Sequence, residues 1–532
     1  MTRRVARARA AEPRAARGGP RLGGATRSAW TDPAALALLA VLAALAVAPL
    51  CGLLLRVALR GGHLAGGDGF LVLDQLQYLN WLRQAGEHVL VANLYDLAPG
   101  PRSFLHPGLL VSGALNALGL GMTASYLVWK PVAVLALWAG ALAWAGRFLD
   151  ARGPRLAAAA IALLFASPVA AAVGRLGLGG ERTRFHFDFL GGELAATNWL
   201  WGYLFTAVAV GLLPLGLLAH ERGRTALAAA AGLLIAWLQP WQGATYLLVL
   251  LAAEAVVWRR RRTPPPLRRL AIEGAATAAP LAYYLALSRL DPSWELAGRA
   301  NDFGAWPWWV TAIGLAPLAV PAAFGLRRAP DDVGGWALRL WPVAALAVFV
   351  APAGTFPAHA FQGLALPLAV LAVLGLADRV GRAAAVAALV VLVVPGTLYR
   401  VDELRAAVNA GRQPFFLTDG EHAALRWLDA APARGGVLAP LYTGLLVPAW
   451  TGRETWVGAG SWTPDFDART QAAERLFSGR MDRAAAEALV RRSGARFLLS
   501  DCHGRADIRA LVAGVTAAPR RFGCATVWEV RR

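Results

Sequence analysis

The sequence has little charge, a single lysine and few cysteines, and each shortage excludes a class of protein. Only 16% of its 532 residues are charged while 57% are hydrophobic, which excludes an ordinary soluble globular fold. Lys130 is the only lysine. The cysteines form neither a Cys-x-x-Cys pair nor a zinc-finger spacing, and the sequence contains no Walker loop. The glycine pieces GGDG and LGLGG do not separate a strand from a helix, so no dinucleotide site is indicated.

Long apolar runs take the place of these motifs. Many are about 20 residues long, enough to cross roughly 30 Å of hydrocarbon. The chain is therefore predicted to be a polytopic α-helical membrane protein. About eleven transmembrane helices are expected, with an error of one or two. They lie at residues 34–56, 123–147, 155–173, 198–219, 225–238, 242–258, 270–288, 308–326, 337–352, 360–377 and 383–398.

The positive charge is distributed as a membrane topology signal. A net charge of +20 could suggest nucleic acid, but the arginines concentrate in the N-terminal tail and in short loops, so we expect membrane lipids and no nucleic acid as partners. Residues 1–32 are predicted to be a disordered basic cytosolic tail, and the first span an uncleaved signal anchor. Arginine-rich inner loops are expected at 148–154, 220–224, 259–269, 327–336 and 378–382. Outer loops are expected at 57–122, 174–197, 289–307 and 353–359.

The segment IAWLQPWQGATYL leaves two topologies open. Pro240 is predicted to lie at an outer turn between two spans. A single kinked helix is the alternative, and it would invert every loop that follows.

The chain changes character after the last span. Residues 33–399 form the predicted transmembrane domain, and residues 400–532 a small extracytoplasmic α/β domain. Helical patterns lie near 420–430, 467–478 and 482–493, and short strands at GVLAP, RFLLS and ATVWEV. Cys502 and Cys524 fall in this domain and either form a disulfide, which an oxidising compartment permits, or remain buried thiols.

The first outer loop, 57–122, contains a predicted amphipathic helix from Leu71 to Leu90. Leu73, Leu76, Leu79, Leu82 and Val89 recur at helical spacing, which favours a position on the membrane surface. Asp74, Gln77, Tyr78 and Trp81 lie on neighbouring faces of the same helix. Asp74 would thus place a carboxylate at the lipid–water boundary, unless it only caps or solvates the helix.

The second outer loop mixes charge with aromatic residues in GERTRFHFDFLGG. Arg182 and Arg184 can bind a phosphate, and His186 can move protons. His186 with Asp188 or Glu181 could instead hold a divalent ion, although no dense ligand spacing supports it. A solvated loop is the other interpretation.

Three further polar residues lie within or beside spans. Lys130 is about two turns into the second span from its outer end, where an ionisable group is costly, and we expect it either to bind an anion or to snorkel to the surface. His359 and Gln362, in GTFPAHAFQG, mark the outer mouth of the tenth span and could reach the same cavity.

Taken together, these features resemble the GT-C superfamily of integral-membrane glycosyltransferases. The resemblance rests on the uncleaved first span, the acidic first outer loop that ends in FLHPGLL, the span number, and the extracytoplasmic tail with EHAALRWLDAAPARGGVLAPLYTGLLVPAWTGRETWVG. It is nearest to bacterial members related to the protein O-mannosyltransferase and aminoarabinose-transferase group.

The resemblance implies transfer of a hexose or pentose from a polyprenyl-phosphate donor to a hydroxyl of a glycan, lipid or protein, by one inverting displacement at the outer face of the bacterial cytoplasmic membrane. Asp74 matches the family's catalytic base, with Asp68 in reserve, and Tyr78 is expected to contact substrate. The family often has an acidic pair here, whereas this chain has Asp74 followed by Gln75. A divalent cation, Mg²⁺ or Mn²⁺, is therefore left open, and no other cofactor is expected.

Two other functions compete with this one. A lipid or glycan transporter should place polar groups in the inner half of several spans, whereas these are mostly Ala, Leu and Val, and no inverted repeat is evident. A non-catalytic relative that kept the fold as a lipid-binding scaffold is the second alternative.

Overall fold

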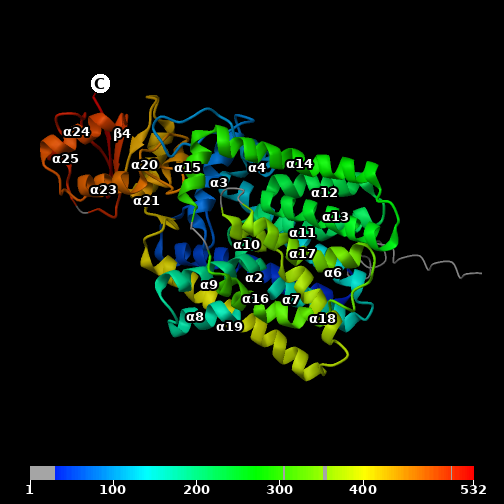
Figure 1. The fold of residues 1–532 in the computed structure, drawn as a ribbon. Coiled ribbons are helices and arrows are strands. Elements are labelled where there is room, and N and C mark those ends of the chain that lie inside the picture. Colours follow the sequence, from blue (N-terminus) through cyan, green and yellow to red (C-terminus); the bar gives the residue numbers. More distant parts are fainter. Residues whose placement is uncertain (1–29, 303–305, 352–355, 505, 532) are drawn as a thin grey trace, which may run out of the picture.

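A computed structural model describes residues 30–302, 306–351, 356–504 and 506–531. Most of the predicted N-terminal tail lies outside these residues. Two parts make up the rest: a helical body of residues 33–410 and a C-terminal unit of residues 411–531, drawn from orange to red in Figure 1. The body is expected to lie in the membrane because its helices are long and apolar.

The helical body contains one short strand, β1 (His63–Leu64), and many helices. These are α2 (Pro33–Arg60), α3 (Val72–Ala85), α4 (Pro107–Leu115), η1 (Asn116–Leu120), α5 (Met122–Leu127), α6 (Trp129–Phe148), α7 (Arg152–Leu164), α8 (Pro168–Leu176), α9 (Glu181–Leu194), α10 (Ala196–Leu200), α11 (Leu204–Glu221), α12 (Thr225–Leu238), α13 (Pro240–Arg261), α14 (Leu267–Leu290), α15 (Pro292–Ala300), α16 (Trp308–Ala323), α17 (Val333–Val350), η2 (Pro357–Phe361), α18 (Ala365–Leu376) and α19 (Arg382–Ala410).

Within the described residues, nine helical segments are long and apolar enough to cross a membrane. The predicted spans at 225–238 and 308–326 correspond to the shorter apolar helices α12 and α16. Each predicted span thus coincides with one helix or with helices joined end to end. Pro240 begins α13, where its fixed φ suits the first helical turn, and α12 and α13 pack against each other as separate helices. The predicted turn is confirmed, and the single kinked helix is wrong.

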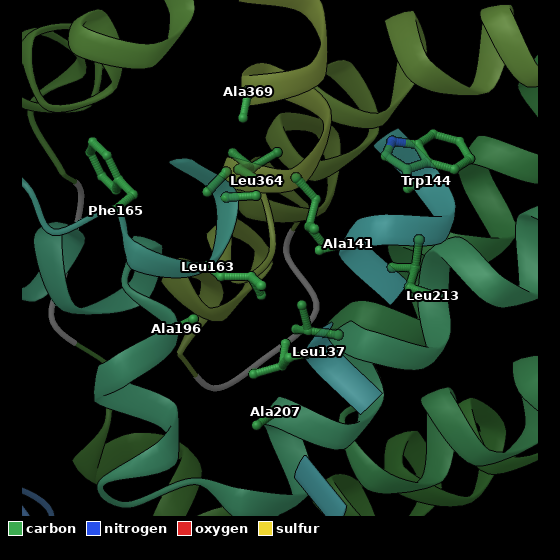
Figure 2. Close-up of a cluster of buried hydrophobic side chains, with 14 of the residues drawn as sticks. Leu137, Ala141, Trp144, Leu163, Phe165, Ala196, Ala207, Leu213, Leu364 and Ala369 are labelled. Carbon is green, nitrogen blue, oxygen red and sulfur yellow. The ribbon is translucent and has the colours of Figure 1, made fainter. Parts of the chain in front are cut away.

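Small residues let the central helices approach closely. Figure 2 shows Leu137 and Ala141 of α6, Leu163 of α7 and Leu213 of α11 among the buried side chains of the core. A Cβ atom added to Gly140 of α6 would collide with the backbone of α11. This close approach stabilises the bundle by van der Waals contact, since lipid offers no hydrophobic driving force between helices.

The connections segregate to two ends of the body. The predicted first outer loop pairs with the C-terminal unit through β1 and β2 (Phe416–Leu417), and Asn301 lies against Ser461 of that unit. At the other end, Arg147 forms ion pairs with Glu221 and Asp332 from two predicted inner loops. We call the first the site end and the second the opposite end. This segregation agrees with the predicted division of the loops.

The C-terminal unit is a small α/β domain whose sheet has the strand order β3-β4-β6-β5. β3 and β4 are parallel, and the other neighbouring strands are antiparallel. Its further elements are α20 (Asp419–Ala430), β3 (Val437–Leu438), α21 (Leu441–Gly444), α22 (Val447–Thr451), α23 (Phe466–Phe477), α24 (Arg483–Ser493), β4 (Phe497–Ser500), α25 (Arg509–Val512), β5 (Arg520–Phe522) and β6 (Ala525–Glu529). The three predicted helices and three predicted strands of this domain are all present.

The predicted domain boundary needs correction. α19 continues past the apolar run to Ala410 and ends at Gly411, whose φ of +63° suits a glycine at a helix C-terminus. The end of the apolar run predicts where the helix leaves an apolar environment, and the helix itself continues beyond that point. The boundary at 399–400 therefore falls inside a helix.

The C-terminal unit contains a Cys502–Cys524 disulfide, so of the two interpretations the buried thiols are wrong. The two Cα atoms are 5.0 Å apart and the cysteines are 22 residues apart in the chain. The bond joins the end of β4 to the turn between β5 and β6.

We predict that the variant Cys502→Ser/Cys524→Ser unfolds more readily. Closing a loop of this length stabilises a folded protein by about 3 kcal/mol. Thermal unfolding of the purified protein, followed by fluorescence of the tryptophans, measures the change. Cys51→Ser is the matched control, because Cys51 is a free, exposed cysteine of α2. An unchanged melting temperature for the double variant would contradict the prediction.

Candidate functional site

The first outer loop contributes a buried helix rather than a surface one. α3 ends at Ala85, short of the predicted Leu90, and it packs between α4 and α5 of the body and α22 of the C-terminal unit. Gln75, Gln77 and Asn80 are buried, whereas Leu73 of the predicted apolar face is 37% exposed. The amphipathic surface helix is therefore wrong, because helices cover α3 on both sides.

Asp74 lies on this helix and is half-buried. Oδ2 accepts a hydrogen bond of 2.8 Å from the Tyr203 hydroxyl, and in the described part of the chain no hydrogen bond engages Oδ1. Burial raises the pKa of Asp74, against the opposing effects of the Tyr203 hydrogen bond and the His359 charge. The side chain is thus held at one oxygen and is free to accept a proton at the other.

Tyr203 and His359 connect Asp74 to a second carboxylate. The Tyr203 ring lies edge-on to the His359 ring, with centroids 5.8 Å apart. Nδ1 of His359 lies 3.1 Å from both carboxylate oxygens of Glu193, which favours a proton on that nitrogen. The Gln362 amide approaches the same nitrogen at 3.1 Å. We call Asp74, Tyr203, His359, Glu193 and Gln362 the Asp74 cluster.

Neighbouring helix starts hold the cluster in place. Gln239, just before α13, donates hydrogen bonds of 2.9 Å to Thr206 of α11 and to Gln362. Gln242 of α13 donates to the His359 carbonyl. The predicted residues Asp74, His359 and Gln362 are therefore brought together from α3, η2 and the segment behind it. Their partners Tyr203 and Glu193 carried no individual sequence signal beyond lying near outer loops.

Tyr78 lies beside the cluster, one helical turn from Asp74. Its ring is 6.5 Å from Tyr203, 6.0 Å from Phe205 and 5.9 Å from Tyr126 between centroids. Burial and the Asp74 charge raise the pKa of Tyr78, so the hydroxyl stays protonated. Tyr78 therefore forms part of an aromatic wall around the carboxylate.

Gln77 adds a buried amide without a partner. It is 3% exposed, and in the described residues neither its Oε1 nor its Nε2 makes a hydrogen bond. It lies three residues after Asp74, so the two side chains are neighbours on the helix surface. A buried amide left unpaired costs about 1–3 kcal/mol, which a polar ligand would recover.

Lys130 and Asp68 pair with each other, contrary to both predictions for Lys130. Lys130 Nζ lies 2.8 Å from Asp68 Oδ2, and the two side chains are 4% and 2% exposed. The ammonium also donates to the carbonyls of Ala46 and Leu200, at 3.0 and 2.6 Å. All its protons are therefore used within the protein, and it neither snorkels nor remains free for an external anion. An isolated ammonium at this depth would be too costly.

The second outer loop is largely a helix, α9, which spreads its predicted site residues apart. Glu181, Arg182 and Arg184 are exposed at its first turn. His186 is buried with its ring 4.9 Å from that of Trp306, and burial, together with the Arg182 charge, lowers the pKa of His186. Arg184 precedes Glu193 by nine residues, about 13 Å along a helix, so the structure does not bring these arginines to Asp74.

Arg400 is a cation near the cluster that the sequence analysis missed. Its Nη1 lies 2.7 Å from Asp188 of α9 and 3.0 Å from Glu403. The guanidinium lies 5.8 Å from the ring of Phe70, between Asp68 and Asp74 in the chain. Arg400 directly follows the last apolar run, inside α19, and a charged residue at that point of the sequence could have indicated it.

Neighbouring protein side chains engage the carboxylates of the cluster. Gln75 stands where a second acid would be, and its side chain binds the Asp68 amide and the Trp201 carbonyl instead. Glu193 is turned to His359 rather than toward Asp74. Across the described ranges, no three His, Cys, Asp or Glu side chains are arranged to hold a metal ion.

The fold has known counterparts although the sequence has none. Neither the comparison with protein-family models nor that with curated proteins finds a match. ArnT from Cupriavidus metallidurans, solved bound to undecaprenyl phosphate, is similar with a TM-score of 0.51, 13% identity and coverage of 95% of this chain and 98% of ArnT. The Archaeoglobus fulgidus oligosaccharyltransferase, solved with Zn and sulfate, has a TM-score of 0.50, 13% identity and coverage of 91% and 71%. The chain therefore has the same overall fold as these two solved proteins.

We predict that Lys130→Met destabilises the protein by about 3–5 kcal/mol, because it leaves the Asp68 carboxylate buried without its cation. The double variant Lys130→Met/Asp68→Asn should recover most of that loss. Thermal unfolding of both variants in the same lipid environment measures the difference. Equal destabilisation by the single and the double variant would show that the pair is not coupled.

Proposed function

We propose that this protein is a membrane glycosyltransferase that moves a sugar from a polyprenyl-phosphate donor to an acceptor hydroxyl at the extracytoplasmic face of the cytoplasmic membrane. The observation that carries the proposal is the Asp74 carboxylate. It lies half-buried at the site end, is held through one oxygen by Tyr203, and has its other oxygen without a hydrogen bond in the described structure.

The fold supports the proposed donor. A similar fold was solved with undecaprenyl phosphate bound, and a lipid-linked donor can remain in the bilayer while its headgroup reaches the site end. Two features favour an extracytoplasmic site end. The arginine-rich short loops are at the opposite end, and the Cys502–Cys524 disulfide belongs to the C-terminal unit beside the site.

The reaction requires one proton acceptor and one stabilised leaving group. Asp74 takes the proton of the acceptor hydroxyl as its oxygen attacks the anomeric carbon of the donor sugar. The bond from that carbon to the phosphate oxygen breaks, and polyprenyl phosphate leaves with the electron pair. Attack opposite the leaving group inverts the anomeric centre. Tyr203 keeps Asp74 oriented, and the His359–Glu193 pair keeps Tyr203 in position.

The departing phosphate needs a cation, and Arg400 is the best placed. Its guanidinium is 8% exposed and faces Asp188 and Glu403, two carboxylates that a phosphate would replace in part. Arg182, Arg184 and His186 lie farther along α9. We assign these three to the approach of the lipid headgroup. Lys130 acts indirectly, by holding Asp68 and the chain that leads to Asp74.

Gln77 is the residue that we assign to substrate hydroxyl groups. A sugar presents donors and acceptors on neighbouring carbons, which matches an amide with both its oxygen and its nitrogen unpaired. Gln77 lies about one helical turn from Asp74, and this closeness supports the assignment.

We predict that Asp74→Asn lowers sugar transfer about 10²–10⁴-fold, because an amide cannot take the proton. Transfer of radiolabelled sugar from polyprenyl-phosphate donors in membranes measures the rate. Since burial raises the pKa of Asp74 and the base must be ionised, wild-type activity should fall with decreasing pH at a midpoint above the ordinary aspartate value of about 3.9.

Glu295→Gln is the matched control for Asp74→Asn. Glu295 is an exposed acid of α15, paired with Arg299. Its variant should transfer sugar at the wild-type rate. Wild-type rates from Asp74→Asn would remove the carboxylate from the mechanism and leave the scaffold function in its place.

We predict that Gln77→Leu separates activity from stability. Removing two unsatisfied buried polar groups should leave the melting temperature unchanged or raised, while kcat/KM falls about 10-fold or more because a substrate hydrogen bond is lost. Gln75→Leu should lower the melting temperature, because the Gln75 amide joins the Asp68 backbone N–H to the Trp201 carbonyl. If Gln77→Leu were fully active, Gln77 would have no contact with substrate.

A further inference from the structure

Three ionisable side chains meet inside the helical body near the opposite end. They are His220 of α11, Glu254 of α13 and Glu273 of α14, with side chains 1%, 8% and 0% exposed. The sequence analysis described the inner halves of the spans as mostly Ala, Leu and Val. It did not predict this polar cluster, because single ionisable residues on separate helices converge only in the folded bundle.

The imidazole of His220 bridges the two carboxylates. Nδ1 lies 2.6 Å from Glu273 Oε2, and Nε2 lies 2.8 Å from Glu254 Oε1. The other oxygen of Glu273, Oε1, is buried and has no hydrogen-bond partner in the described residues. The three side chains therefore form a linear chain, Glu254–His220–Glu273, with Glu273 Oε1 left without a hydrogen bond. We call them the His220 triad.

This geometry requires an additional proton. A neutral imidazole carries one N–H and one lone pair, so it can donate to only one carboxylate while its lone pair repels the other. With a second proton, both nitrogens donate, and one positive charge lies between two negative ones. Two buried carboxylates without that charge would cost several kcal/mol each. A metal ion does not fit, because the ring nitrogens point in opposite directions and share no centre.

We propose that the His220 triad is a proton-binding site, in which His220 is held as an imidazolium that ties α11, α13 and α14 together. Its ligand is one proton beyond the neutral imidazole. Two carboxylates and one imidazolium leave the triad with one net negative charge, which favours keeping that proton. The proposal is independent of sugar transfer.

Charged groups on the helices around the triad have partners elsewhere. Glu221 of α11 pairs with Arg147 of α6, and Arg222 bonds the Leu218 carbonyl. The Tyr246 hydroxyl of α13 donates to the Ala228 carbonyl of α12. Further charged residues near these helix ends include Arg224 of the turn before α12, Arg259, Arg260 and Arg261 of α13 with its C-cap Arg262, Arg268 and Arg269 of α14, Arg327, Arg328, Asp331 and Asp332 before α17, and Arg339 of α17.

The three tied helices are also those that present the site. α11 begins directly after Tyr203, α13 directly after Gln239, and α14 carries Tyr283, whose hydroxyl bonds the chain at Leu105 and Ser103 near the site end. α11 is 18 residues long, about 27 Å, so the triad fixes the far ends of the same helices. Loss of the proton would weaken the contacts among α11, α13 and α14 at the opposite end, and so loosen the packing of the helices that support the site.

Nitrogen-15 NMR of histidine-labelled full-length protein in lipid nanodiscs tests the proposal directly. At pH 8 an ordinary exposed histidine is neutral. His220 should instead show two protonated ring nitrogens, with the signal assigned by its loss in His220→Gln. Glu254→Gln shifts the same signal and provides the assignment if His220→Gln does not fold. A neutral His220 at pH 8 overturns the proposal.

Thermal stability gives the second measurement. A proton bound in the folded protein and not in the unfolded chain contributes stability that is lost as pH rises through its release. Wild-type melting should therefore fall by roughly 4 °C or more between about pH 7 and pH 9.5. His220→Gln/Glu254→Gln/Glu273→Gln keeps polar side chains but no charge and should remove that part of the fall. Identical pH slopes for the two proteins would count against the triad as a proton site.

Discussion

The buried ion pair between Asp68 and Lys130 is the interaction on which the site depends. It anchors the first outer connection to α6, and Gln75 extends the anchor to the Trp201 carbonyl. Asp74 follows six residues after Asp68, so its position against Tyr203 is set by this attachment. An ammonium and a carboxylate at 4% and 2% exposure cannot separate without large cost, which makes the start of α3 a rigid support.

Both polar clusters of the helical body pair glutamate carboxylates with an imidazole. In the Asp74 cluster, Glu193 faces His359, and in the His220 triad two glutamates face one imidazole. Each cluster joins segments that are distant in sequence. α11 and α13 carry His220 and Glu254 of the triad, and their first turns support the Asp74 cluster through Thr206 and Gln242. Amide side chains such as Gln239 complete the hydrogen bonding at the site end. The same helices therefore carry the polar contacts that hold the bundle and those that shape the site.

Some site residues could be predicted and others could not, for physical reasons. Asp74, His359 and Gln362 stand out in sequence because a polar residue at a span mouth is conspicuous, and the structure places them together. Arg182 and Arg184 are equally conspicuous in the sequence but lie at the exposed start of α9. The composition of a loop does not predict which end of a helix within it faces the site. Glu193, Tyr203 and Arg400 were not singled out, because their importance comes from neighbours more than a hundred residues away.

The sequence by itself determined the membrane-spanning body, the order of its spans, the turn at Pro240 and the α/β character of the C-terminal unit. These follow from local hydrophobic periodicity and helix-start chemistry, which neighbouring residues decide. Only the tertiary structure decided that α3 is buried, that Lys130 belongs to Asp68, and that His220 meets Glu254 and Glu273. A charge buried in an apolar interior must find a partner wherever the fold provides one, and that partner's place in the chain leaves no trace in the local pattern.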